Sequence, residues 1–128
     1  MLRDFFAFVG RLTPGRVLLL GLFCSVIIEA VTVLARFALD FQITRDTGFL
    51  AQLTFGMRIH HGYMGLALLP FSLLFQNPGV RKLVVIIAIG LVLSDLFHHF
   101  LVLWPLTGSP QFDLFYPPRI VVPFSPPS

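Results

Sequence analysis

Residues 83–103 read LVVIIAIGLVLSDLFHHFLVL, and this stretch decides the class of fold. It is apolar without interruption from Leu83 to Leu93, after which Ser94, Asp95 and a pair of histidines follow. A helix needs about 20 predominantly apolar residues to cross the roughly 30 Å hydrocarbon core of a bilayer. The stretch therefore predicts a transmembrane helix that carries ionisable side chains towards one end.

Two further stretches of similar character lie on the N-terminal side, at about 17–39 and about 55–75. Turn-forming residues separate the three stretches, because Pro14-Gly15 precedes the first and residues 76–79 (QNPG) connect the second to the third. We therefore expect an all-α integral membrane protein with three transmembrane helices, at about 17–39, 55–75 and 83–103.

The end of the third stretch and the tail after it are rich in helix-breaking residues. Pro105 and residues 108–110 (GSP) are expected to end the helix, and 105–128 holds seven of the ten prolines. Such a composition favours an extended tail without a packed core. We thus divide the chain into a basic N-terminal segment (1–16), a transmembrane domain (17–104) and a Pro-rich extended C-terminal tail (105–128).

The overall composition excludes several classes of protein. Of 128 residues, 56% are hydrophobic and 12% are charged, against about 45–50% and 25% in average soluble domains. A soluble domain this small needs many polar residues to cover its surface. The composition excludes a soluble enzyme, a disordered chain and a nucleic-acid-binding protein, and the single Cys24 excludes an intrachain disulfide or a cysteine metal cluster.

The positions of the basic residues predict the topology. Arg3, Arg11 and Arg16 precede the first stretch, and Arg81 and Lys82 lie in the short connection between the second and third. Cytoplasmic loops carry an excess of Lys and Arg, so both segments are placed inside. We expect a multi-pass protein of the prokaryotic inner (plasma) membrane, with the N-terminus inside and the C-terminus outside.

The ionisable residues within the three stretches fall at similar depths. With a rise of about 1.5 Å per helical residue, their heights above the cytoplasmic end lie at roughly 18–28 Å. Each costs about 2.5–3.5 kcal/mol at the centre of a membrane helix, so such residues are rare without a role. The layer comprises Glu29, Arg36, Arg58, His60, His61, Asp95, His98 and His99.

Helical geometry predicts how these side chains are shared between neighbours. Asp95 meets His98 or His99 on one face because the pairs are three and four residues apart. Adjacent histidines point about 100° apart, so each pair is expected to divide its roles. Gly62 and Gly65 are small enough to let a neighbouring helix approach closely.

The first hypothesis for this layer is a transition-metal site. Imidazole suits Zn, Cu, Fe or Ni, and added carboxylates favour Fe, Mn or Zn. The sequence D-L-F-H-H at 95–99 resembles the H-x-x-H-H box of membrane desaturases and hydroxylases. A metal ion with an open coordination position would allow oxidation or hydrolysis of a membrane-dissolved substrate. The candidate ligands are His61, His98, His99 and Asp95, then Glu29 and His60, with Arg58 or Arg36 as a clamp for an anionic substrate.

The second hypothesis is haem b held by one histidine from each of two helices. The pattern Ile59-x-His61-x-x-x-Gly65 is similar to the first motif of succinate dehydrogenase cytochrome b anchors, which are also three-span chains. That resemblance implies an axial histidine at His61. Arg58 or Arg36 would then bind the haem propionates.

Two other functions are compatible with the same residues. Glu29, Asp95 and the histidines could pass protons in a proton or ion translocation component. Alternatively, pairs such as Glu29 with Arg36 could hold together a structural or assembly subunit without catalytic activity, with His60 on the outer surface. Three helices barely enclose a site, so we expect a homo-oligomer or a complex with other membrane subunits. The sequence does not establish whether the protein is an enzyme.

Overall fold

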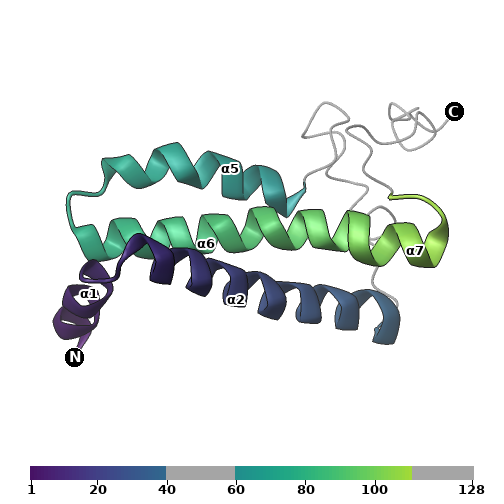
Figure 1. Cartoon of the computed structure of the whole chain (residues 1–128), viewed down its shortest axis with the longest axis horizontal. Coiled ribbons are helices and arrows are strands. Elements are labelled where there is room, and N and C mark those ends of the chain that lie inside the picture. Colours follow the sequence, from purple (N-terminus) through teal and green to yellow (C-terminus); the bar gives the residue numbers. More distant parts are fainter. Residues whose placement is uncertain (40–59, 111–128) are drawn as a thin grey trace, which may run out of the picture.

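The structure, a computed structural model, describes residues 1–39 and 60–110, and all regular structure in these two ranges is helical (Figure 1). Two of the long helices end in a wider π-helical turn. The elements are α1 (Leu2–Gly10), α2 (Pro14–Val33) with the π-helix η1 (Leu34–Ala38), α5 (His61–Phe71) with the 3-10 turn η2 (Ser72–Leu74), α6 (Pro78–Phe97) with the π-helix η3 (His98–Leu103), and α7 (Trp104–Thr107).

Both long helices begin where the sequence places a proline after a capping residue. The hydroxyl of Thr13 accepts a hydrogen bond from the backbone N–H of Arg16 at 3.4 Å, and Pro14 follows at the first helical position of α2. The side chain of Asn77 accepts from the N–H groups of Gly79 and Val80 at 2.9 and 3.3 Å at the start of α6. Proline costs nothing at such a position because its missing N–H would have no helical partner there.

The third stretch continues past the proline that was expected to end it. Pro105 lies in the first turn of α7, where its missing N–H is tolerated, because the π-helix η3 has already changed the hydrogen-bond register. The helix ends at Gly108, whose φ of 73° is left-handed and suits glycine, so the helix end predicted at 108–110 is confirmed.

A short helix that the sequence analysis did not anticipate lies within the basic N-terminal segment. Helix α1 packs across the start of α6, with Val9 and Leu12 buried against it. The ammonium group of Lys82 on α6 donates to the carbonyl oxygens of Gly10 and Leu12 at 2.7 and 2.6 Å. These bonds fix the α1–α2 connection to α6.

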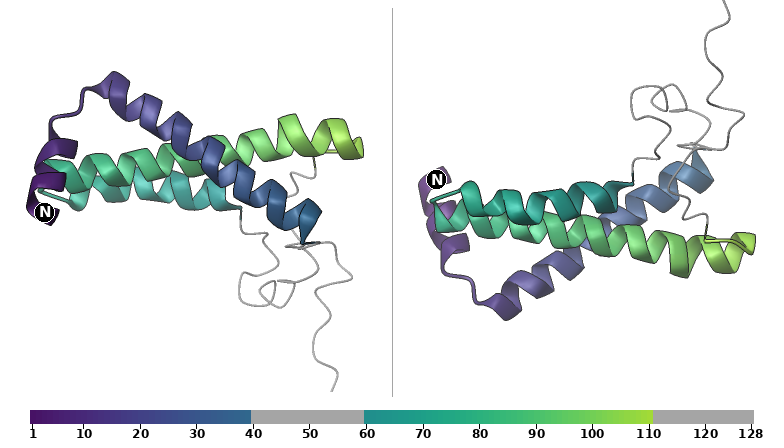
Figure 2. Two further views of the ribbon diagram at one scale, coloured as in Figure 1. Left: turned by 90° about the horizontal axis from the view of Figure 1, so that it is seen from below. Right: turned by 90° about the horizontal axis from the view of Figure 1, so that it is seen from above.

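Helix α6 is the centre of the arrangement, with α2 and α5 packed along it (Figures 1 and 2). Helix α5 runs antiparallel to α6, whereas α2 runs in the same general direction as α6 and crosses it at an angle. A Cβ atom on Gly62 would lie 2.7 Å from a carboxylate oxygen of Asp95, and one on Gly65 would lie 2.6 Å from the carbonyl oxygen of Ala88. The close approach predicted for these two glycines is therefore confirmed.

Two helical segments of the described chain are long and apolar enough to cross a membrane. They are Pro14–Ala38, with 25 residues, and Pro78–Thr107, with 30. The third apolar helical segment, His61–Leu74, is shorter than a span, and the expected start of that span at 55–59 lies outside the described residues. Residues 111–128 of the tail also lie outside the described residues, so the extended conformation expected for them stays a prediction.

Candidate metal centre

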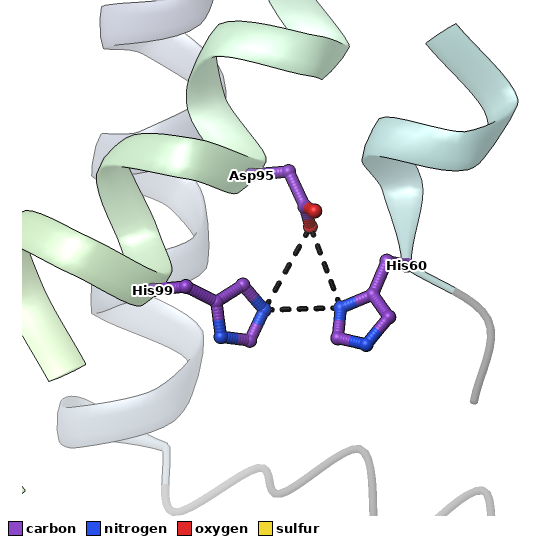
Figure 3. A group of neighbouring side chains, drawn as sticks. All are labelled: His60, Asp95 and His99. Atoms are coloured by element: carbon purple, nitrogen blue, oxygen red, sulfur yellow. Dashed lines mark hydrogen bonds and ion pairs between the residues drawn. The ribbon is translucent and has the colours of Figure 1, made fainter. Parts of the chain in front are cut away.

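Three side chains from two helices meet at the end of the bundle farthest from α1 (Figure 3). His60 is the capping residue just before α5, in an extended conformation. Asp95 lies on α6, and His99 lies one turn later in the π-helix η3. The exposed fractions of the three residues are 6%, 3% and 6%, so the group is buried.

The ligand atoms of this group lie at distances that suit one ion. The Nδ1 atom of His60 lies 3.0 Å from Nε2 of His99, and these nitrogens lie 3.7 and 3.9 Å from Oδ1 of Asp95. A tetrahedral ion with bonds of about 2.0–2.1 Å separates its ligand atoms by roughly 3.3 Å. Small adjustments of the side chains would therefore bring all three atoms into one coordination sphere.

The Oδ1 atom of Asp95 is the least satisfied acceptor of the group. It is buried and accepts no hydrogen bond within the described residues. Imidazole nitrogens of His60, His61 and His99 surround it at 3.7, 3.3 and 3.9 Å. A buried carboxylate oxygen without a partner is costly, and coordination to a cation removes that cost.

The tautomer of His99 is determined by its second ring nitrogen. Nδ1 of His99 lies 2.6 Å from the backbone carbonyl oxygen of Pro110. A carbonyl oxygen only accepts, so Nδ1 carries the proton and donates it. In the neutral ring, Nε2 then presents a lone pair to His60 and Asp95, which is the usual arrangement of a metal-binding histidine and its backbone partner.

A second polar cluster joins all three long helices beside this group. Nδ1 of His98 donates to the carboxylate of Glu29 on α2 at 3.0 Å. The hydroxyl of Ser94 donates to the same carboxylate at 3.4 Å and lies 3.3 Å from Nε2 of His61. His61 thus lies between the two clusters, because its Nδ1 faces Asp95.

Each histidine pair divides its roles as predicted, but helical rotation explains this only for His98 and His99, because His60 precedes α5 in an extended conformation. His60 and His99 face each other, whereas His61 and His98 face Ser94 and Glu29. The exposed position considered for His60 is not observed, since it is 6% exposed. Of the six candidate ligands, three therefore form the compact group, and the other three form its polar neighbourhood.

Of the two candidate clamp residues, the structure describes Arg36. Its guanidinium, on η1, lies 5.8 Å from the ring centroid of Phe37. Arg58 lies outside the described residues. Sequence reasoning missed Ser94 and the carbonyl of Pro110. Ser94 was detectable as the neighbour of Asp95, whereas a backbone carbonyl leaves no signal in the residue type.

No family model matches this chain, and comparisons with curated proteins and with solved structures found no match either. The chemistry of the site therefore carries the functional argument.

Proposed function

We propose that this chain is an integral membrane protein that binds one divalent transition-metal ion through His60, Asp95 and His99. The observation that carries the proposal is the buried, unsatisfied Oδ1 of Asp95 beside two imidazole nitrogens that lie 3.0 Å apart. Three protein ligands leave at least one coordination position open, as in catalytic zinc sites and in non-haem iron sites with two histidines and one carboxylate.

The exposed apolar surface supports the membrane location. Only 17% of the most apolar part of Pro14–Ala38 is buried inside the structure, although this segment is more hydrophobic than Pro78–Thr107. Helices of a soluble protein bury such surface, so lipid is the natural cover here. The three-span arrangement expected from the sequence is part of this proposal: it would place the N-terminus inside, the C-terminus outside and the metal group in the outer half of the bilayer.

The donor set favours a bare ion over haem. Axial nitrogens on opposite faces of a haem iron lie about 4 Å apart, twice a metal–nitrogen bond of about 2.0 Å, with the flat ring between them. His60 and His99 approach more closely than that, and their rings stand edge to face with centroids 4.8 Å apart. Two imidazoles with one carboxylate suit iron or zinc best among the candidate metals.

An open coordination position defines the chemistry that such an ion supplies. Zinc or iron bound here would act as a Lewis acid, and iron would also supply redox chemistry. Because the group is buried at membrane depth, the substrate class is a molecule dissolved in the bilayer. The resemblance of residues 95–99 to the histidine box of membrane hydroxylases agrees with this class.

A structural role is the second candidate, and a specific observation favours it. Glu29, Ser94 and His98 connect α2 to α6 without needing an ion, and His61 extends this network to α5. In that case the facing nitrogens of His60 and His99 share a proton, and no metal binds. The chain would then serve as an assembly subunit, as a homo-oligomer or with other membrane subunits.

Elemental analysis of matched asparagine variants separates the two candidates. Asparagine places an amide N–H near the position of histidine Nδ1 and lacks Nε2, so His99→Asn keeps a donor for Pro110 while removing the ligand atom. His98→Asn is the matched control, because it keeps the donor to Glu29 and lies on the adjacent position. The protein is purified in mild detergent without a histidine tag.

The metal proposal predicts about one iron or zinc ion per chain in the wild type and in His98→Asn, with loss in His99→Asn. Metal at background level in a wild-type protein from metal-replete cells would overturn it in favour of the structural role. Equal loss in both variants would place the ion elsewhere or indicate a general effect on folding.

A further inference from the structure

A cleft lies at the opposite end of the bundle from the metal group. It has a volume of about 460 Å³ and is formed by the first turns of α2, the 3-10 turn η2 and the first three turns of α6. This volume falls in the range of sites that hold small molecules, roughly 300–1,000 Å³. Its walls are mostly apolar, with Val17, Leu18, Leu73, Val85 and Ile89 among the lining residues.

Two cationic side chains of α6 complete the lining. Arg81 is exposed, and Lys82 is half-buried with two of its three N–H groups donated to the carbonyl oxygens of Gly10 and Leu12. Those bonds hold the ammonium group at one place. The cleft therefore combines apolar walls with fixed positive charge.

Basic side chains outnumber acidic ones at this end of the described structure. Among residues 1–39 and 60–110, the acidic side chain at this end is that of Asp4, and it is paired with the N-terminal ammonium group at 2.8 Å. Arg81 and Lys82 lie near the N-terminus of α6, where the helix dipole disfavours cations and favours anions. An anionic group at the cleft would offset both effects. The basic residues in α1, between α1 and α2, and in the first turns of α2 and α6 are Arg3, Arg11, Arg16, Arg81 and Lys82.

We infer that this cleft binds one anionic glycerophospholipid, with an acyl chain against the apolar walls and the phosphate at Arg81 and Lys82. Leu18 and Leu73 line the cleft and are 53% and 73% exposed, so it is continuous with the surface that lipid would cover. The inference rests on the proposed membrane location, and it is independent of the metal group at the other end. The phosphate group supplies the negative charge, and the bilayer supplies the lipid.

Native mass spectrometry of the full chain released from detergent micelles tests this inference. The probes are phosphatidylglycerol and phosphatidylcholine with identical acyl chains, added at equal concentration. One phosphatidylglycerol is expected to bind in preference to phosphatidylcholine. Arg81→Gln should weaken phosphatidylglycerol binding about fivefold, because one basic residue near an anionic surface contributes a factor of that size.

Two matched controls distinguish specific lipid binding in the cleft from nonspecific attraction of anionic lipid to the basic residues at this end. Arg11→Gln removes a charge from the same end outside the cleft lining and should leave lipid binding unchanged. Leu18→Trp fills the cleft and should lower the binding of both lipids, whereas Leu19→Trp, at a 67% exposed position outside the lining, should not.

Equal retention of the two lipids, or equal effects of Arg81→Gln and Arg11→Gln, would overturn the inference. Binding of inorganic phosphate in place of lipid would overturn the lipid assignment as well. Metal content measured on the same samples distinguishes the lipid proposal from the metal proposal. A variant that loses lipid selectivity should keep the metal content of the wild type. Failure of the membrane location itself would show as a chain that stays soluble without detergent.

Discussion

The Nδ1 atom of His60 lies 3.0 Å from the Nε2 atom of His99, although the two residues are 39 positions apart in the chain. One nitrogen comes from the capping residue just before α5 and the other from the π-helix that follows α6 (Figure 3). Asp95 lies one turn before His99 and turns its carboxylate towards both. A shared cation would bind the two helices together at this point, and several consequences can be measured.

Removal of the ion should destabilise the wild-type protein. A ligand that binds only the folded state stabilises it by about 2.7 kcal/mol at a free concentration 100 times its dissociation constant. A membrane-permeant chelator should therefore lower the melting temperature of the wild type in detergent, and zinc or iron should restore it. The melting temperature of His99→Asn should not respond, and a chelator effect of equal size in that variant would contradict the assignment of the site.

Gly62→Ala should damage the metal group without altering any ligand. The added Cβ would lie 2.7 Å from Oδ2 and 2.9 Å from Cβ of Asp95, so the carboxylate or the helix must move. We expect destabilisation of about 1–3 kcal/mol, as for other overpacked sites, and at least a tenfold weaker affinity for the ion. Gly15→Ala is the control, because nothing lies within 4 Å of its added Cβ. Unchanged metal affinity in Gly62→Ala would show that Asp95 is not held against α5.

The pair of Glu29 and His98 should stabilise the packing of α2 on α6 independently of metal. A double-mutant cycle with Glu29→Ala and His98→Ala should give a coupling free energy of about 0.6 kcal/mol, the average measured for polar contacts between membrane helices, and at most about 1.7 kcal/mol. Unfolding in mixed micelles provides the measurement. The cycle that combines Glu29→Ala with His99→Ala should give a coupling near zero, and a coupling as large as that of the contacting pair would indicate a single connected network.

The number of spans can be tested by labelling the two ends of the described chain. In a Cys24→Ser background, Ser109→Cys and Leu2→Cys each place one thiol at an exposed position. Three spans predict that a membrane-impermeant maleimide reaches Ser109→Cys from outside intact cells and reaches Leu2→Cys only after permeabilisation. Labelling of both variants from the same side would contradict three spans and the proposed topology.

Sequence reasoning accounts for the helical class and for much of the candidate site. The hydropathy of 83–103 and 17–39 is a local property, and the helices Pro78–Thr107 and Pro14–Ala38 follow from it. The 100° rotation between adjacent helical residues was enough to predict that His98 and His99 divide their roles, whereas His60 differs from His61 because it precedes α5 in an extended conformation. Helix ends were harder to predict, because Pro105 is harmless once a π-helix precedes it.

Tertiary structure alone decided which histidines meet. Depth calculations placed all four imidazoles within a few ångströms of each other in height, but height says nothing about the rotation of one helix relative to another. The packing of Gly62 against Asp95 sets that rotation and brings His60 to His99, leaving His61 towards Ser94.

The amino-acid sequence by itself therefore determined the apolar helices and the depth of their ionisable groups, because hydropathy and helical rise act within one segment. The grouping of His60, Asp95 and His99, the backbone partner of His99 and the apolar cleft at the other end arise between segments. They depend on contacts among residues far apart in the chain, and such contacts exist only after the helices have packed.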